Sequence, residues 1–253
     1  MYRKYYRFLL GGHDLEMNGI GEMLRQNRKI VYDLHLSWGA RLSSYTYVLN
    51  SEDTFVGIEL TEDISPPAHY IAIDHHNQNS HKASSIEQIA ELLGIKLNRE
   101  QQLIAANDRG YIPAMIEMGA TPDEITDIRC RDREAQGITE EDELLAEQSI
   151  RENLSTEKDL IIVNALTPRF SAITDRLFPF EKLLIYSNDS LTYYGRQAKA
   201  IAGLFMPLVE KHKAYYGGGE NNLLGIRNEW IYSFGNITKA INLIINLINK
   251  GHV

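Results

Sequence analysis

The stretch PPAHYIAIDHHN, residues 66–77, places Asp74, His75 and His76 directly after a short apolar run. The run 70–73 carries no charge, which is typical of a strand that is buried on both faces of a parallel sheet. Ionisable side chains at the end of such a strand lose part of their hydration, so they need a partner that compensates their charge. The sequence therefore predicts that something is held at this strand end.

Other short apolar runs in the first half predict further strands, at YYRFLLGG (5–12), YTYVLNS (45–51) and DTFVGIEL (53–60). The segment 84–94, SSIEQIAELLG, has its apolar residues at helical spacing. A serine start signal with Glu87, and Gly94 as a stop, predict its ends. Strands that alternate with helices indicate an α/β fold with a mostly parallel sheet and helices on both faces. The stretch 27–42 carries mixed helix and strand signals and receives no assignment.

The remainder of the chain predicts a connector and a second domain. Residues 121–154 combine dense charge of mixed sign with scattered apolar positions, which is typical of exposed helices. The later apolar runs predict strands at 160–166, 182–188 and 191–195 and helices at 171–178 and 237–250. We therefore expect an N-terminal domain over 1–120, a helical connector over 121–157 and a smaller C-terminal α/β domain over 158–253.

Composition limits the classes of partner. The 253 residues carry 26 Lys and Arg against 34 Asp and Glu, a formal net charge of −8, so no overall basic field attracts long duplex nucleic acid. A single cysteine, Cys130, permits no internal disulfide and suits a reducing compartment. No apolar run approaches the length of a membrane span. We expect a cytoplasmic protein that binds neither membrane nor long duplex nucleic acid.

Acidic and imidazole side chains recur where the predicted strands end, and functional groups of an open α/β sheet gather beyond the carboxyl ends of its strands. A further aspartate follows an apolar helical run and precedes a glycine. Converging carboxylates would repel one another unless cations or protons compensated them. The candidates are His13, Asp14, Glu16, Glu59, Asp74, His75, His76 and Asp108.

Divalent metal is the simpler form of compensation. Carboxylate and imidazole ligands without thiolate favour Mn²⁺, with Mg²⁺, Fe²⁺ and Co²⁺ as alternatives. The candidate ligands outnumber those that one ion with an open position needs, so we expect two ions roughly 3.5–4 Å apart. Such a pair would lower the pKa of a shared water from 15.7 toward about 7 and aim a bridging hydroxide at an electrophile, most naturally phosphorus.

A second group of candidates lies in the C-terminal half. Three consecutive glycines, Gly217, Gly218 and Gly219, allow backbone N–H groups to approach an anion closely, although a flexible turn is an equal alternative. Arg196 stands at an expected helix start, where its guanidinium could hold a phosphate bidentately, although an exposed arginine is more often solvated. We take these residues as candidate substrate contacts.

The motifs also resemble those of the DHH phosphoesterase superfamily, over most of the chain. AIDHHNQNSHKASSIEQIAELLG (72–94) is similar to the Asp-His-His motif that names the family and to the helix start after it. GHDLEMNGIG (12–21), FVGIELTED (55–63) and LIAANDRGYIPAM (103–115) resemble its first, second and fourth motifs. YYGGGENNLLG (215–225) resembles the glycine-rich substrate loop of the associated C-terminal domain.

This resemblance implies a role for each candidate residue. Residues 1–120 would form the metal-binding catalytic domain and residues 158–253 the substrate-binding domain. Asp14 and Glu16 would each bind one metal, Glu59 would bridge both, and His75 with Asp108 would complete the second site. His13 could serve the first metal. Asp74 and His76 would orient ligands or contact the substrate phosphate.

Two functions from different classes follow. The first is a manganese-dependent phosphohydrolase, a phosphodiesterase or phosphatase, that acts on a small nucleotide or a short oligonucleotide. The second is a nucleotide- or metal-binding regulatory protein of the same fold with weakened catalysis. It is motivated by Glu16 and Glu59, which stand where the family usually has aspartate, and by Glu220, which follows the glycines where the family has histidine. The apolar closing helix is expected in the core or against a second copy, as in a homodimer.

Overall fold

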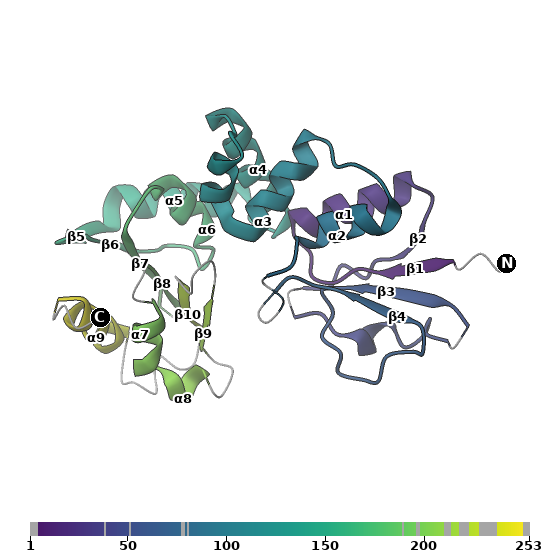
Figure 1. The fold of residues 1–253 in the computed structure, drawn as a ribbon. Coiled ribbons are helices and arrows are strands. Elements are labelled where there is room, and N and C mark those ends of the chain that lie inside the picture. The colour runs from purple at the N-terminus through teal and green to yellow at the C-terminus, as the bar shows by residue number, and fades with distance from the viewer. Residues whose placement is uncertain are drawn as a thin grey trace. The chain divides into compact units, whose positions relative to one another are not determined.

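The computed structural model describes residues 5–37, 39–50, 52–76, 79, 81–188, 190–195, 198–209, 214–217, 223–227 and 237–249. The chain divides into two compact units, residues 1–137 and 138–253 (Figure 1). Each unit contains its own sheet, so each is described by itself.

A four-stranded sheet forms the centre of the first unit, with the strand order β2-β1-β3-β4. All neighbouring strands are parallel, and Phe8 of the first strand lies opposite Val31 on one side and Val56 on the other. This confirms the mostly parallel N-terminal sheet that the apolar runs predict. The strands are β1 (Tyr6–Leu9), β2 (Ile30–Tyr32), β3 (Thr54–Ile58) and β4 (Tyr70–Ile73).

Helices pack on one face of this sheet, where Phe8, Val56 and Ile58 share a buried cluster with Ile20 and Ile86. The predicted helix at 84–94 is confirmed in detail. Its N-terminus is a capping box between Ser84 and Glu87, and it ends at Gly94 in the left-handed conformation with φ 68°. The helices of this unit are α1 (Leu15–Gln26), α2 (Ser85–Leu93), α3 (Arg99–Glu117) and α4 (Pro122–Ala135).

The strand predicted at 45–51 is wrong. A short 3-10 helix, η1 (Leu42–Tyr45), and turns occupy this part of the chain, and Leu42 and Tyr45 pack against Leu9 and Phe55 on the second face of the sheet. Their spacing of three residues suits a helical turn, whereas a strand buries alternate residues. The sheet instead contains a strand that was not predicted, β2, within the stretch 27–42 that received no assignment.

The second unit is built on a six-stranded mixed sheet with the order β5-β6-β7-β8-β10-β9. It confirms the predicted strands and helices of the C-terminal half, and the closing helix packs its buried residues Ala240, Ile244 and Ile248 into the core. The predicted connector contains two helices, of which α4 belongs to the first unit and α5 to the second. The elements are α5 (Glu140–Asn153), β5 (Leu154–Glu157), β6 (Leu160–Asn164), α6 (Ser171–Leu177), β7 (Lys182–Tyr186), β8 (Ser190–Tyr194), α7 (Ala198–Leu204), α8 (Met206–Val209), β9 (Ala214–Gly217), β10 (Leu223–Arg227) and α9 (Ile237–Asn249).

The chain is therefore an α/β protein with a parallel N-terminal sheet and a second sheet domain. Among its described helices, none combines the length and the apolar character that crossing a membrane requires.

Candidate metal centre

The first acidic position lies at the start of α1, the helix that follows β1. Asp14 is the N-cap of this helix, and its Oδ1 accepts a hydrogen bond of 2.8 Å from the N–H of Met17. The turn before it depends on Gly11, because a Cβ at this position would lie 2.3 Å from the carbonyl oxygen of Ile58. This close approach brings the ends of β1 and β3 together, and with them Asp14 and Glu59.

Glu16 lies in the first turn of α1 and is only 2% exposed. Its Oε1 accepts a hydrogen bond of 3.0 Å from the N–H of Ile86, in the first turn of α2. Free N–H groups at a helix N-terminus favour a carboxylate. One oxygen of Glu16 is thus anchored on α2, and the other, Oε2, lies 3.6 Å from Nε2 of His75.

Glu59 follows the last residue of β3 and has a left-handed backbone conformation, with φ 54°. This conformation is uncommon for a residue other than glycine. The hydrogen bond from its N–H to the carbonyl of Ile73 (2.8 Å) and that from Ser85 Oγ to its Oε1 (2.7 Å) hold it in place. The N-terminus of α2 therefore anchors both glutamates, Glu16 through the N–H of Ile86 and Glu59 through the hydroxyl of Ser85.

Asp108 comes from α3, at the point where this helix is kinked. Gly110 (φ −158°, ψ 20°) and Tyr111 (φ 60°, ψ −151°) have non-helical backbone angles, and Pro113 follows. The kink therefore begins two residues after Asp108. The prediction that Asp108 follows an apolar helical run is confirmed.

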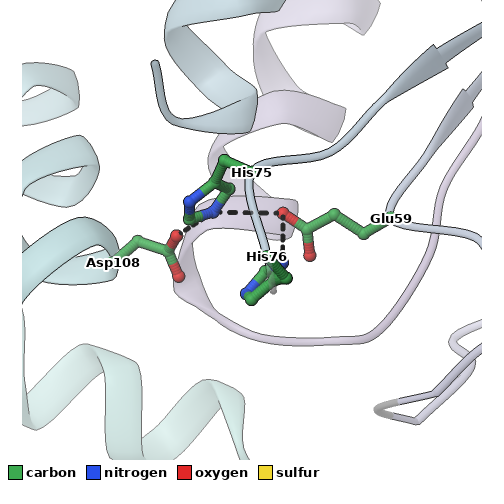
Figure 2. Close-up of side chains that lie close together, drawn as sticks. All are labelled: Glu59, His75, His76 and Asp108. Carbon is green, nitrogen blue, oxygen red and sulfur yellow. Dashed lines mark ion pairs between the residues drawn. The ribbon is translucent and has the colours of Figure 1, made fainter. Parts of the chain in front are cut away.

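His75 lies among these carboxylates, and Figure 2 shows it between Glu59 and Asp108. Its Nε2 is 2.5 Å from Asp108 Oδ2 and 3.6 Å from both Glu16 Oε2 and Glu59 Oε1. His76 Nδ1 lies 3.9 Å from the same Glu59 oxygen. Glu59, His75, His76 and Asp108 each offer one ligand atom, and these atoms all lie within 4.8 Å of one another.

The protonation states of the cluster reflect its burial. Burial, reinforced by the neighbouring carboxylates, raises the pKa of Asp14 and of Glu16 well above the ordinary range and raises that of Glu59. Burial alone would lower the pKa of His75, but the carboxylates of Asp108 and Glu16 outweigh it and raise this pKa to about 10. Without a cation, His75 therefore keeps a proton that a free imidazole would mostly lose at neutral pH.

Three atoms of the cluster fit a bound cation. Glu16 Oε2, His75 Nε2 and Asp108 Oδ2 are buried and make no hydrogen bond among the described residues, although His75 Nε2 lies 2.5 Å from Asp108 Oδ2. Buried polar atoms are rarely left in this state. A divalent cation would satisfy all three, and carboxylate oxygens with imidazole nitrogen suit Mn²⁺ and related ions.

Asp74 and His76 form the exposed side of the cluster. Asp74 Oδ1 accepts a hydrogen bond of 2.9 Å from the N–H of His76 and lies 3.2 Å from its Nδ1, and Oδ2 accepts one of 2.9 Å from Asn79. Burial raises the pKa of Asp74, but these donors outweigh it, and the net pKa is lowered. Asp74 thus stays ionised and fixes the orientation of the His76 ring, whose side chain is 39% exposed.

Other predicted site residues lie elsewhere. His13 Nδ1 is 3.2 Å from the carbonyl oxygen of Ala135, and its ring packs on that of His35 with 5.1 Å between centroids. Within the described residues, no ion pair joins His13 to the cluster around His75, so its role as a ligand stays a prediction. Gly217 is the last residue of β9, whereas Arg196, Gly218 and Gly219 lie outside the described residues.

Sequence reasoning recognised Ser85 only as a helix start and missed its contact with Glu59. It likewise missed the N–H of Ile86 as an anchor for Glu16. The signal was present, since two consecutive serines stand at the helix start and only Ser84, the N-cap, is needed for the capping box. A fully buried second serine indicates a further partner, and here this partner is a carboxylate.

Comparisons with known proteins place the fold. No family model matches the chain, and no curated protein matches it in sequence. Among solved structures, it resembles the pGpG-specific phosphodiesterase PggH from Vibrio cholerae, with 14% identity and a TM-score of 0.53, over 97% of this chain and 99% of that one.

Two more distant structures are a manganese-bound exonuclease RecJ and the DHH domain of a member of the s1p family of ribosomal proteins. RecJ has 9% identity and a TM-score of 0.46, over 94% of this chain and 89% of that one. The DHH domain has 12% identity and a TM-score of 0.46, over 90% of this chain and 73% of that one. The likeness to PggH shows that the chain shares the fold of that phosphodiesterase. The Asp74-His75-His76 motif follows β4 directly, in agreement with the resemblance of the sequence to the DHH phosphoesterase superfamily.

Proposed function

We propose that this protein is a metal-dependent phosphoesterase that hydrolyses a phosphodiester or phosphomonoester of a small nucleotide or short oligonucleotide. The observation that carries the proposal is the convergence of Glu16, Glu59 and Asp108 on His75, with three buried ligand atoms that have no hydrogen-bond partner in the described part of the chain. Perturbed ionisable groups of this kind gather at functional sites.

The proposed cofactor is a pair of divalent ions, with Mn²⁺ as the preferred metal. Glu16, Glu59, His75 and Asp108 would hold them, together with Asp14, whose pKa responds to Glu59 and Asp108. When bound, the ions supply Lewis-acid activation of water and of a phosphoryl oxygen. The anchoring of Glu16 and Glu59 on α2 supports this arrangement, because ligands whose orientation is fixed lose little freedom on binding.

His76 is the proposed phosphate contact. It borders the cluster at Glu59, is partly exposed, and is oriented by Asp74, so a substrate that approaches the ligands meets its imidazole. Asp74 would hold the ring in place through its contact with Nδ1. Arg196 and Gly217–Gly219 remain the proposed contacts of the C-terminal domain with the rest of the substrate.

The proposed substrate is small. PggH is named for pGpG, a dinucleotide, and it matches this chain along nearly its whole length. The net charge of −8 supports the same choice, since binding of long duplex nucleic acid depends on neutralising many phosphates. We propose a cytoplasmic location, in keeping with the single cysteine.

Metal analysis combined with a hydrolysis assay tests this function. The purified protein is analysed for metal and then incubated with a bis-aryl phosphodiester, with and without Mn²⁺. We expect two metals per chain, turnover that Mn²⁺ stimulates, and loss of both in His75→Ala. One metal or none, with nucleotide binding but no turnover, would instead support a regulatory protein of the same fold. Absence of both metal binding and nucleotide binding would overturn both functions.

A further inference from the structure

The first unit buries a charged group that the proposed reaction does not use. Arg129, on α4, is 7% exposed, and its neighbour on the next turn, Asp132, is 6% exposed. Nη1 of Arg129 lies 2.7 Å from Oδ2 of Asp132. Burial of such a pair costs desolvation that its mutual attraction does not reliably repay, so a buried pair is weak evidence for stability and invites another explanation.

The contacts of Arg129 enclose the segment that carries Asp108. Nη1 donates to Oδ1 of Asn107 at 2.9 Å, and Cζ lies 4.6 Å from the centroid of the Tyr111 ring. Asn107 precedes Asp108 directly, and Tyr111 follows it by three residues. One guanidinium thus contacts α3 on both sides of the residue that points toward His75.

This segment needs such contacts because its backbone is strained. The left-handed φ of 60° at Tyr111 is unfavourable for an aromatic residue, and strained residues persist only where their surroundings hold them. A guanidinium over the face of an aromatic ring is attractive, so Arg129 stabilises Tyr111 in this conformation. The kink, in turn, ends the helical turn from which Asp108 projects.

The same ion pair extends to α1. Oδ1 of Asp132 accepts a hydrogen bond of 3.4 Å from the N–H of Leu15, which lies between Asp14 and Glu16. Arg129 and Asp132 together therefore contact both helices, α1 and α3, that supply acidic ligands to the centre.

We propose that Arg129 is a positioning residue for the metal centre, which holds Asp108 through Asn107 and Tyr111 and the start of α1 through Asp132. The inference rests on the proposed function, since it assumes that Asp108 binds metal. Groups that orient metal ligands from behind commonly change metal affinity by about 10- to 100-fold when they are removed.

The test is to measure the affinity of Arg129→Lys and Asn107→Ala for Mn²⁺. Electron paramagnetic resonance measures binding as a loss of the free-ion signal. Lysine keeps the charge but has neither the fork nor the planar face, so we expect it to weaken affinity about 10- to 100-fold. Asn107→Ala removes a single contact from a helix and keeps the helical backbone, so it reports on positioning even if the first variant folds poorly.

The matched control is Arg99→Met. Arg99 also joins α3 to α4, because its Nε lies 3.0 Å from Glu124 Oε1. It is the first residue of α3, however, and does not adjoin Asp108 in sequence. We expect this control to bind Mn²⁺ with wild-type affinity. Across the metal-free variants, the melting temperature should not correlate with the affinity for Mn²⁺. Wild-type affinity in both Arg129→Lys and Asn107→Ala would overturn the inference while the function stands. A wild-type protein that binds no Mn²⁺ would overturn the function as well.

Discussion

The hydroxyl of Ser85 provides the sharpest test of how the centre is built. It donates a hydrogen bond of 2.7 Å to Oε1 of Glu59, and its side chain is fully buried. Ser85→Ala removes this donor at the first position of α2, where alanine is well tolerated. Glu59 then keeps its left-handed backbone but loses the contact that fixes its carboxylate.

The magnitude follows from the type of bond. A hydrogen bond to a charged acceptor contributes about 1.5–3 kcal/mol, and each 1.4 kcal/mol corresponds to a tenfold change in affinity. Ser85→Ala should therefore raise the dissociation constant for Mn²⁺ by about 10- to 100-fold. Isothermal titration calorimetry of the metal-free protein, prepared with a chelator, measures this change.

Ser84→Ala is the matched control. Ser84 is equally buried, but its hydroxyl accepts from the N–H of Glu87 as the N-cap of α2. Its loss should lower the free energy of unfolding by about 1 kcal/mol and leave Mn²⁺ affinity within a few-fold of wild type. If Ser85→Ala bound Mn²⁺ like the wild type, or if Ser84→Ala weakened binding more, the anchoring of Glu59 by Ser85 would be refuted.

The remaining predictions concern pH, the turn after β1 and the exposed side of the centre. In metal-free protein, His75 has a folded-state pKa of about 10, above its ordinary value, so its contribution to stability is complete below about pH 6.5 and is lost as pH rises through 10. The raised pKa of Glu16 also makes stability fall as pH rises, so the melting temperature in chelator should fall between pH 6.5 and 10. Mn²⁺ affinity should rise with pH, because the ligands must lose protons to bind metal. A melting temperature that rises over this interval would contradict the assignment. Gly11→Ala should lower the free energy of unfolding by about 1–3 kcal/mol in urea denaturation, because its Cβ would meet the end of β3. Gly203→Ala, within α7 and with open space around the added Cβ, should be neutral or stabilising. Equal effects of the two changes would argue against the close approach at residue 11. Asp74→Ala should lower turnover at least tenfold and leave Mn²⁺ affinity nearly unchanged, because both its oxygens already accept hydrogen bonds, and complete loss of Mn²⁺ binding would make it a ligand instead.

Local signals explain why part of this fold could be predicted. The helix α2 carries its own start and stop, in Ser84, Glu87 and Gly94, and the structure contains all three as caps. The clustering of Glu59 with His75 was also predictable, because the carboxyl ends of parallel strands meet at one edge of a sheet. These inferences need only short-range pattern and general topology.

Features that depend on long-range contacts could not be predicted. β2 has only three residues, too few for a periodic pattern, and its pairing with β1 is set by the sheet. Tyrosine is typical of strands, but the hydroxyl of Tyr45 donates a hydrogen bond of 2.6 Å to the carbonyl oxygen of Leu10. This contact favours a helical turn at Tyr45. Tyr111, with its left-handed backbone, is contacted by Arg129, which comes from another helix.

The consequence of having glutamate in place of aspartate in the centre could not be predicted from the sequence either. Glu16 and Glu59 are one methylene longer than the aspartates that are usual in the family that the sequence resembles, which motivated the alternative of weakened catalysis. The structure gives both longer side chains a partner on α2, in Ile86 and Ser85. Their length therefore matches this helix start, and replacement of either by aspartate should weaken the centre.

The most direct measurement is anomalous diffraction from crystals grown with Mn²⁺, collected on both sides of the manganese absorption edge. We predict anomalous peaks at the cluster, with one within coordination distance of Glu16 Oε2, His75 Nε2 and Asp108 Oδ2. Peaks confined to the exposed acidic residues of α4 and α5, or no peak at His75, would contradict the account.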